Sequence, residues 1–457
     1  MGTREHTRTQ IFQVSTLYGA ATLAAAIDIG RFGRPGRSSR SGAAPGNIRR
    51  VLLVSNNAEI PETALRLDTM AGYERIAGRF DTMIEWNHTI RPNHPATWGP
   101  RPDETPLWQR ALRTAWGLGR GPVELIVESI QVNPAKALAA IFADSPVQVY
   151  ADGLMSYGPT RSELPQSIAC RIQRLLHLDL VPGLRPLLLS EYSVPAELVP
   201  DGAFRAVLAE IAVCAADDPQ VTKAVEAAPT ALMLGQYLAA LGILTADEEE
   251  HLHTRMLRGA AAAGHRSVLF KPHPTAPARY SLALSEAAAA AGVQLTVLHG
   301  RLLAETLYER CRPGLVVGCF STALLTASAY YGIPIARVGT STVLERLAPY
   351  ANSNRIPLVI VDHLVPDLES GAAPAVPGAA PSTLGPLVRA VGYGMQPNLH
   401  PLLRDETAAL LTAATGDGGG TSRYFPRDRL TELGLPGGTA PSPASRLRRS
   451  LVRDRRG

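Results

Sequence analysis

Short runs of consecutive apolar residues recur along the chain, separated by longer stretches in which apolar residues follow a helical period. Runs of four or five such residues between helices are typical of strands buried on both faces of a parallel sheet. Repeated strand–helix units predict a doubly wound α/β domain. In the first half of the chain the predicted strands are Ile11–Val14, Val51–Val54, Thr82–Glu85, Leu125–Val127 and Val147–Tyr150.

The same rhythm returns in the second half, after a long helical stretch from Ala203 to Glu226 that is closed by Pro229. We therefore expect two Rossmann-like domains facing each other across a cleft, over residues 9–228 and 229–415. The predicted strands of the second half are Ala231–Leu234, Val268–Phe270, Val293–Leu298, Leu315–Gly318 and Leu358–Val361.

The last residues, 416–457, are rich in Gly, Pro and Arg and predict a flexible basic tail. Residues 445–456 would suit a basic amphipathic helix at a membrane surface, although a solvated tail is the simpler interpretation. The formal net charge is +5, and six arginines lie in this short segment, so the rest of the chain is close to neutral. With an aromatic content of only 5%, nucleic acid is not expected as a partner.

The four cysteines are scattered and form no C-x-x-C pair, which favours a reducing compartment over a disulfide framework or a zinc site. Polar residues such as Gln10 and Gln13 interrupt the N-terminal apolar stretch, so no signal peptide is expected. No run of about 18 apolar residues occurs, and no membrane span is expected. The cytoplasm is the predicted location.

The segment Lys271-Pro272-His273-Pro274 follows a predicted strand and carries the clearest candidate chemistry. Proline fixes its own φ and pushes the residue before it out of the α region, so His273 is held on stiff, extended backbone. The carboxyl end of a strand is where open α/β sheets place ligands. An imidazole there can donate a proton to a departing phosphate. The alternative is a histidine that only ends the strand.

Two other strand ends carry candidate groups. Asp152-Gly153 follows the strand ending at Tyr150, and its carboxylate could act as a general base, with Glu128 at the end of the preceding strand as the main rival. Asp-Gly is also an ordinary turn pair. Ser321-Thr322 lies between a strand and a helix, where either residue can cap the helix, bind an anion, or do both.

Several common sites are missing from the sequence. There is no P-loop, no G-x-G-x-x-G and no D-x-D triad, so we expect neither an NTPase or dinucleotide site nor a bound metal. His251-x-His253 places its two rings on different faces of a helix, and we interpret both as surface residues.

The ordered set Tyr150-Ala151-Asp152-Gly153, Lys271-Pro272-His273-Pro274 and Cys319-Phe320-Ser321-Thr322 resembles the bacterial polysialyltransferase-type family. The opening segment Gln10–Thr16 and Leu234-Gly235-Gln236 are similar in kind, and the likeness spans about residues 9–415.

The resemblance implies a GT-B fold and an inverting glycosyltransferase that uses a CMP-activated sialic acid without a metal or cofactor. The first domain would face the glycan or glycolipid acceptor, and the second would bind the nucleotide sugar. Asp152 would deprotonate the acceptor hydroxyl, and His273 would protonate or stabilise the leaving CMP phosphate. The residues expected to contact the donor are Gly153, Gly235, Gln236, Lys271, Pro274, Ser321 and Thr322.

The sequence departs from the family pattern at Ala151, where the family has an acid. If that first acid is the base, Asp152 must replace it. Two alternatives therefore stay open: a GT-B transferase using a UDP-sugar or CDP-polyol, and a non-catalytic relative that only binds a nucleotide sugar or glycan. The acceptor, the linkage and any polymerising action are not specified by these residues.

Overall fold

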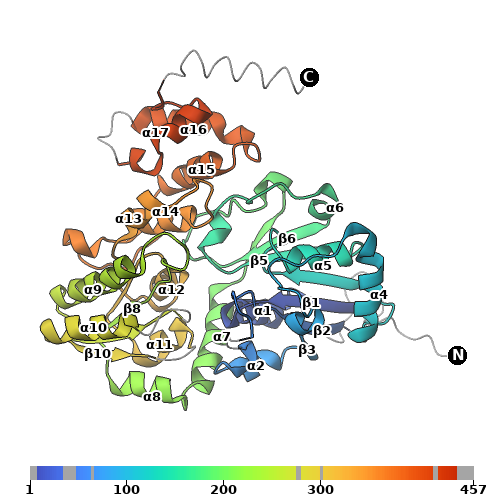
Figure 1. Ribbon diagram of the computed structural model, residues 1–457, viewed down its shortest axis with the longest axis horizontal. Helices are drawn as coiled ribbons and strands as arrows, with labels where there is room; N and C mark the ends of the chain where they lie inside the picture. The colour runs from blue at the N-terminus through green and yellow to red at the C-terminus, as the bar shows by residue number, and fades with distance from the viewer. Residues whose placement is uncertain are drawn as a thin grey trace.

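Two parallel sheets, one in each half of the sequence, form the centre of the molecule (Figure 1). The computed structural model describes residues 8–33, 48–62, 66–273, 279–298, 302–414 and 420–439. The seven-stranded sheet has the order β3-β2-β1-β4-β5-β6-β7, and the five-stranded sheet has the order β10-β9-β8-β11-β12. The strands are β1 (Arg8–Val14), β2 (Ile48–Val54), β3 (Thr82–Glu85), β4 (Val123–Val127), β5 (Val147–Ala151), β6 (Ile172–His177), β7 (Ala196–Leu198), β8 (Ala231–Leu234), β9 (Ser267–Lys271), β10 (Gln294–Val297), β11 (Leu315–Gly318) and β12 (Ile335–Arg337).

Helices surround both sheets, and all neighbouring strands run parallel. The strand order reverses once in each sheet, between β1 and β4 in the first and between β8 and β11 in the second. Open α/β sheets bind ligands at such topological switch points. The helices are α1 (Leu17–Asp28), α2 (Tyr73–Ala77), α3 (Trp86–Thr89), α4 (Thr105–Ala115), α5 (Ala135–Ile141), α6 (Gln166–Ala169), α7 (Asp201–Cys214), α8 (Pro219–Glu226), α9 (Ala246–Ala262), α10 (Arg279–Ala290), α11 (Ala304–Cys311), α12 (Thr322–Tyr331), α13 (Thr340–Arg346), α14 (Arg355–Leu364), α15 (Leu384–Met395), α16 (Arg404–Ala414) and α17 (Arg427–Leu433).

Nine of the ten predicted strands are present, and one prediction is wrong. Leu358–Val361 lies inside helix α14, where all four residues are fully buried. A short helix buried on every side has no polar face, so its apolar run cannot be told from a strand by periodicity. Three strands were missed. Polar Gln173 and Arg174 interrupt β6, and both β7 and β12 have only three residues.

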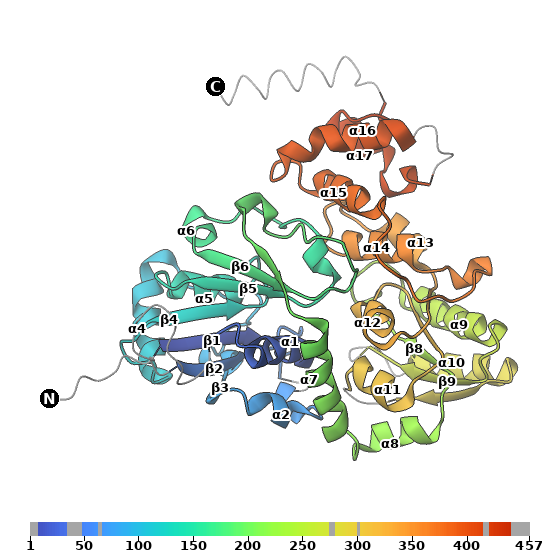
Figure 2. The ribbon, with the colours of Figure 1, turned by 180° about the vertical axis from the view of Figure 1, so that it is seen from behind.

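Helix α7 joins the two halves and packs against both of them (Figure 2). The ring of Phe204 on α7 lies 5.1 Å from that of Tyr18 on α1 and 5.6 Å from that of Tyr330 on α12, measured between centroids. These edge-on contacts bury aromatic surface from both domains in one cluster. Helix α8 ends at Glu226 and β8 begins at Ala231, on either side of the predicted domain boundary.

The chain crosses back to the first domain near its C-terminus. The amide of Gln396 donates to the carbonyl of Arg161 at 2.6 Å. A side chain at Gly392 on α15 would collide with Leu187, since its Cβ would lie 2.3 Å from the Leu187 Cδ2. Glycine at this position therefore permits close contact between α15 and the first domain.

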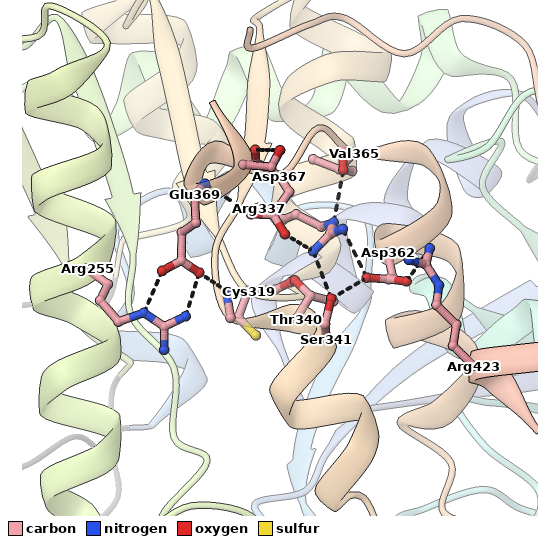
Figure 3. Close-up of polar contacts among 12 residues, drawn as sticks. Arg255, Cys319, Arg337, Thr340, Ser341, Asp362, Val365, Asp367, Glu369 and Arg423 are labelled. Atoms are coloured by element: carbon pink, nitrogen blue, oxygen red, sulfur yellow. Dashed lines mark hydrogen bonds and ion pairs between the residues drawn. The ribbon is translucent and has the colours of Figure 1, made fainter. Parts of the chain in front are cut away.

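An ionic network around the buried Asp362 carboxylate joins Arg423, in segment 420–439, to the second sheet (Figure 3). The Asp362 carboxylate, on α14, accepts from Arg337 at 3.1 Å through Oδ1 and from Arg423 at 2.8 Å through Oδ2. The hydroxyl of buried Tyr424 also donates to Oδ2, at 2.9 Å. Arg337 bonds Asp367 as well, at 2.8 Å. These charged and polar partners replace the hydrogen bonds with water that the carboxylate loses when it is buried.

Residues 420–439, which we expected in the flexible tail, are therefore ordered: they include α17 and the buried side chains of Tyr424, Phe425 and Leu430. A flexible tail was expected because the segment is rich in Gly and Pro. A few buried apolar side chains are nevertheless enough to pack such a segment against the rest of the protein. Residues 440–457, and with them the proposed amphipathic helix at 445–456, lie outside the described residues. Of the helices in the described part of the chain, none has the length and hydropathy needed to cross a bilayer.

Candidate active site

A cleft of about 1380 Å³ lies between the two sheets and is lined by residues of both domains. Two doubly wound domains facing one cleft form the GT-B arrangement, so the predicted fold class is confirmed. All eight predicted site residues within the described ranges line this cleft: Asp152, Gly153, Gly235, Gln236, Lys271, His273, Ser321 and Thr322. Pro274 lies outside the described residues.

Asp152 follows β5 directly and is partly buried beside the first turn of α1. Its Oδ2 lies 3.1 Å from where a Cβ would stand at Gly19, so any side chain at residue 19 would crowd the carboxylate. Burial, together with the negative charge of nearby Glu128, raises the pKa of Asp152 to about 7. A carboxylate that titrates near neutral pH is suited to general base catalysis.

Glu128, the rival for this role, follows β4 and also lines the cleft. The hydroxyl of Ser15 donates to its Oε2 at 2.6 Å, and its backbone N–H donates to the Gln13 side-chain oxygen at 3.1 Å. Burial raises the pKa of Glu128, while hydrogen bonds to its carboxylate from Ser15 and the Gln13 side chain oppose the shift. Glu128 is thus fixed in place by the end of β1 and the loop that follows it.

Ala151 does not point towards Asp152: its side chain packs against the core on the opposite face of the sheet. Gly153 instead contacts the second domain. A Cβ at this position would lie 3.0 Å from the Thr322 hydroxyl oxygen, and that oxygen accepts from the Leu154 N–H at 3.4 Å. The turn after β5 and the start of α12 therefore meet directly across the domain interface.

His273 lies two residues beyond β9, on backbone that Gly235 supports. The Gly235 N–H donates to the Lys271 carbonyl at 2.8 Å. A Cβ at Gly235 would lie 2.8 Å from the Pro272 Cα and 2.9 Å from the His273 nitrogen, closer than such atoms pack. Gly235 is required because two backbone segments approach each other here.

The imidazole of His273 stacks on the ring of Tyr237, with centroids 4.0 Å apart and planes 26° from parallel. Burial and the nearby charge of Lys271 lower the pKa of His273 to about 4. Burial also lowers the pKa of Lys271. In the protein alone, His273 is therefore a neutral ring at pH 7 and acts as a hydrogen-bond donor or acceptor.

Gln236 is buried, and its side chain donates to the Leu234 carbonyl at 3.3 Å. Its backbone N–H donates to His253 Nε2 at 3.2 Å. The expectation that His253 lies on the surface is therefore wrong: the ring is fully buried and packs 5.1 Å from Phe270, whereas His251 is exposed. An apolar face of α9 carries His253 into the core, where burial lowers its pKa to about 4.

Ser321 caps α12, because its side-chain oxygen accepts from the Ala323 N–H at 3.2 Å. Thr322, the first residue of the helix, uses its hydroxyl towards Leu154 as described above. The two adjacent residues thus have different contacts: Ser321 stabilises the helix start, and Thr322 joins the domains. Ser321, Thr322 and Ala323 line the cleft, so the positive end of the α12 dipole lies at the cleft wall and favours an anion.

A further polar group, Glu305, lies beside Lys271 and was not predicted from the sequence. Glu305 on α11 lines the cleft, is almost fully buried and has a pKa raised by burial. The Thr326 hydroxyl on α12 lies 3.5 Å from that of Tyr18 on α1, which is another polar contact between the domains. One signal was available: Glu305 is an acid placed in the first turn of a helix, after a strand.

Within the described ranges, no three His, Cys, Asp or Glu side chains gather closely enough to hold a metal ion.

The sequence profile of the family described as alpha-2,8-polysialyltransferase matches residues 10–340. The chain belongs to this family. It is a sialyltransferase-like glycosyltransferase, and the family implies a nucleotide-sugar donor and a glycan acceptor. No curated protein sequence matches the chain significantly.

Solved structures similar to the chain are distant. The GT-B domain of a sialyltransferase from Photobacterium damselae is 12% identical, with a TM-score of 0.40, over 78% of this chain and 96% of that one. A UDP-GlcNAc 2-epimerase from Neisseria meningitidis, bound to UDP-GlcNAc, is 12% identical, with a TM-score of 0.42, over 72% and 82%. The chain is assigned to the polysialyltransferase family from the match to the family profile alone, and not from these structural similarities.

Proposed function

We propose that the chain transfers sialic acid, or a related nonulosonic acid, from a CMP-activated donor to a glycan hydroxyl, with inversion and without a metal ion or cofactor. The observation that carries the proposal is the convergence of three strand ends on one cleft. Asp152 comes from the first sheet, and His273 and Ser321 come from the second.

Asp152 is the proposed base. Its carboxylate takes the proton from the acceptor hydroxyl as the hydroxyl oxygen bonds to the anomeric carbon. The bond from that carbon to the phosphate oxygen breaks, and its electron pair leaves with CMP. A carboxyl with a pKa of about 7 is half ionised at neutral pH and is a stronger base than an ordinary aspartate.

His273 is the proposed partner of the leaving phosphate. The neutral ring donates a hydrogen bond to a phosphate oxygen, and the anion itself raises the affinity of the imidazole for a second proton. Lys271 and the N–H groups at the start of α12 add positive charge on the same side of the cleft. Gly235 and Tyr237 keep the His273 backbone and ring in place.

A thermal-shift panel with CMP-, CDP-, UDP- and GDP-linked donors tests the donor. We expect CMP-sialic acid and CMP to raise the melting temperature of the wild type, and CMP to raise that of Asp152→Asn equally. His273→Ala should lose most of this effect, while His251→Ala, which removes an exposed histidine, should keep it. Stabilisation by UDP-sugars and not by CMP-sugars would refute the proposal. CMP binding without turnover would indicate a binding protein.

A glycolipid acceptor, a cytoplasmic location and a membrane contact through the Arg-rich tail stay predictions from the sequence.

A further inference from the structure

Glu128 and Asp152 lie on the same face of the first sheet. Their strands β4 and β5 are adjacent and parallel, with Val127 paired to Val149. Ile126 and Tyr150 pack in the core on one side of the sheet, and Val127 and Val149 pack in the core on the other. Successive residues of a strand alternate between faces. Glu128 therefore shares the face of Ile126, and Asp152 shares that of Tyr150.

Helix α1 covers this face, and the segment from Ser15 to its first turn lies against both carboxyl groups. Ser15, just before the helix, donates to Glu128 at 2.6 Å. Asp152 lies against the helix at Gly19. An acid at residue 151 would point into the opposite core, where Ala151 packs. The second carboxylate beside Asp152 thus comes from the neighbouring strand.

The other titratable groups near the pair are two tyrosines of the first domain and, on the opposite wall of the cleft, an acid and a lysine of the second. Tyr150 is close enough to both carboxyls for their charges to raise its pKa, and it donates to the Gln13 carbonyl at 3.2 Å. Tyr18 of α1 faces both Asp152 and, across the domain interface, Glu305. Both tyrosines have pKa values raised far above neutral by burial, so they stay uncharged. Lys271, which Glu305 faces, is the basic group on the opposite wall.

We propose that Glu128, held by Ser15, is a positioning residue whose carboxylate strengthens Asp152 as the base that takes the acceptor's proton. The hydroxyl of Ser15 stabilises the ionised form of Glu128, so the negative charge of the pair stays there. The proton from the acceptor then goes to Asp152, and the pair carries one negative charge after transfer instead of two. This inference rests on the proposed role of Asp152.

The pH dependence of kcat/KM between pH 5 and 9, with a CMP-sialic acid donor, tests the proposal on the full chain. Removing the charge of Glu128 lowers the pKa of Asp152. The acid limb of Glu128→Gln should therefore move down by about one pH unit, and the plateau should fall about three-fold because the base is weaker. Ser15→Ala should move the limb the same way by a smaller amount. Glu124→Gln, a control that removes another buried carboxylate of β4 away from the cleft, should leave the limb in place.

An unmoved acid limb in Glu128→Gln would overturn the proposal. Loss of turnover at every pH would also overturn it, because Glu128 would then be the base itself. If the wild type releases no CMP, the proposed function fails, and a stability cycle tests the pair alone. At pH 8, Asp152→Asn should raise the melting temperature less in a Glu128→Gln background than in the wild type. An equal stabilisation in both backgrounds would refute the coupling.

Discussion

Replacing Asp152 by asparagine should strongly lower turnover and, at the same time, stabilise the folded protein at alkaline pH. The carboxyl has a pKa of 3.8 as a free group and about 7 in the folded chain, raised by burial and by Glu128. Below the lower value both the folded and unfolded states are protonated, so the carboxyl costs no stability. Between the two values the unfolded state releases its proton while the folded state keeps it, so stability falls as pH rises and the loss is complete above the upper value.

The size of this loss follows from the difference between the two pKa values. Each pKa unit corresponds to about 1.4 kcal/mol, so the upper limit is about 4 kcal/mol above pH 7. Asp152 keeps some contact with solvent at the cleft wall, which reduces the cost to about 2 kcal/mol. For a chain of this length the melting temperature of Asp152→Asn should exceed that of the wild type by about 2 °C at pH 8.

Differential scanning fluorimetry at pH 5 and pH 8, with CMP release measured alongside, checks both effects. The gap in melting temperature at pH 5 should be about a third of that at pH 8, and kcat should fall by about 10²–10⁴. Asp103→Asn, at an exposed residue, is the matched control and should change neither quantity. A melting temperature of Asp152→Asn equal to or below that of the wild type at pH 8 would refute the burial argument.

Three further substitutions test other parts of the structure. His273→Gln should lower kcat by about 10²–10⁴ with little change in melting temperature, and His251→Gln should leave both unchanged; equal activity of the two variants would remove His273 from the mechanism. Gly235→Ala should lower kcat/KM at least about ten-fold, because the new Cβ displaces the backbone of Pro272 and His273, whereas Gly202→Ala, with nothing within 4 Å of its Cβ, should be neutral. Asp362→Ala should lower the free energy of unfolding by about 3 kcal/mol in urea titrations, since it leaves buried Arg337 with one carboxylate fewer; a loss no larger than that of exposed Asp405→Ala would show that the network adds no stability.

The sequence predicts most of the sheet architecture, because strands buried on both faces carry their own signal as short apolar runs. It fails where that signal is ambiguous or absent. The run Leu358–Val361 is helical because α14 is buried all round, and edge strand β7 is too short to show a period. The order of residues 420–439 depends on long-range contacts of Tyr424 with Tyr350 and Asp362, which no local pattern contains.

The candidate site follows the same division. Asp152, His273 and Ser321 were found because each stands where a parallel strand ends, and the ends of parallel strands share one edge of a sheet. The contact of Thr322 with Leu154 depends on how the two domains pack, and the position of Glu305 beside Lys271 depends on how α11 packs within the second domain. Domain packing has no short-range sequence signature. The structure also separates the roles of Ser321 and Thr322, which the sequence treated as one pair.

The most direct test of the proposed function is CMP release from CMP-sialic acid by the purified chain in the presence of EDTA and a glycan acceptor, with the anomeric configuration of the product determined by NMR. We predict acceptor-dependent CMP release that EDTA does not reduce, a product of inverted configuration, and no comparable reaction with UDP-sugars. Release that requires a divalent metal, retention of configuration, or turnover of UDP-sugars alone would contradict the assignment of this cleft.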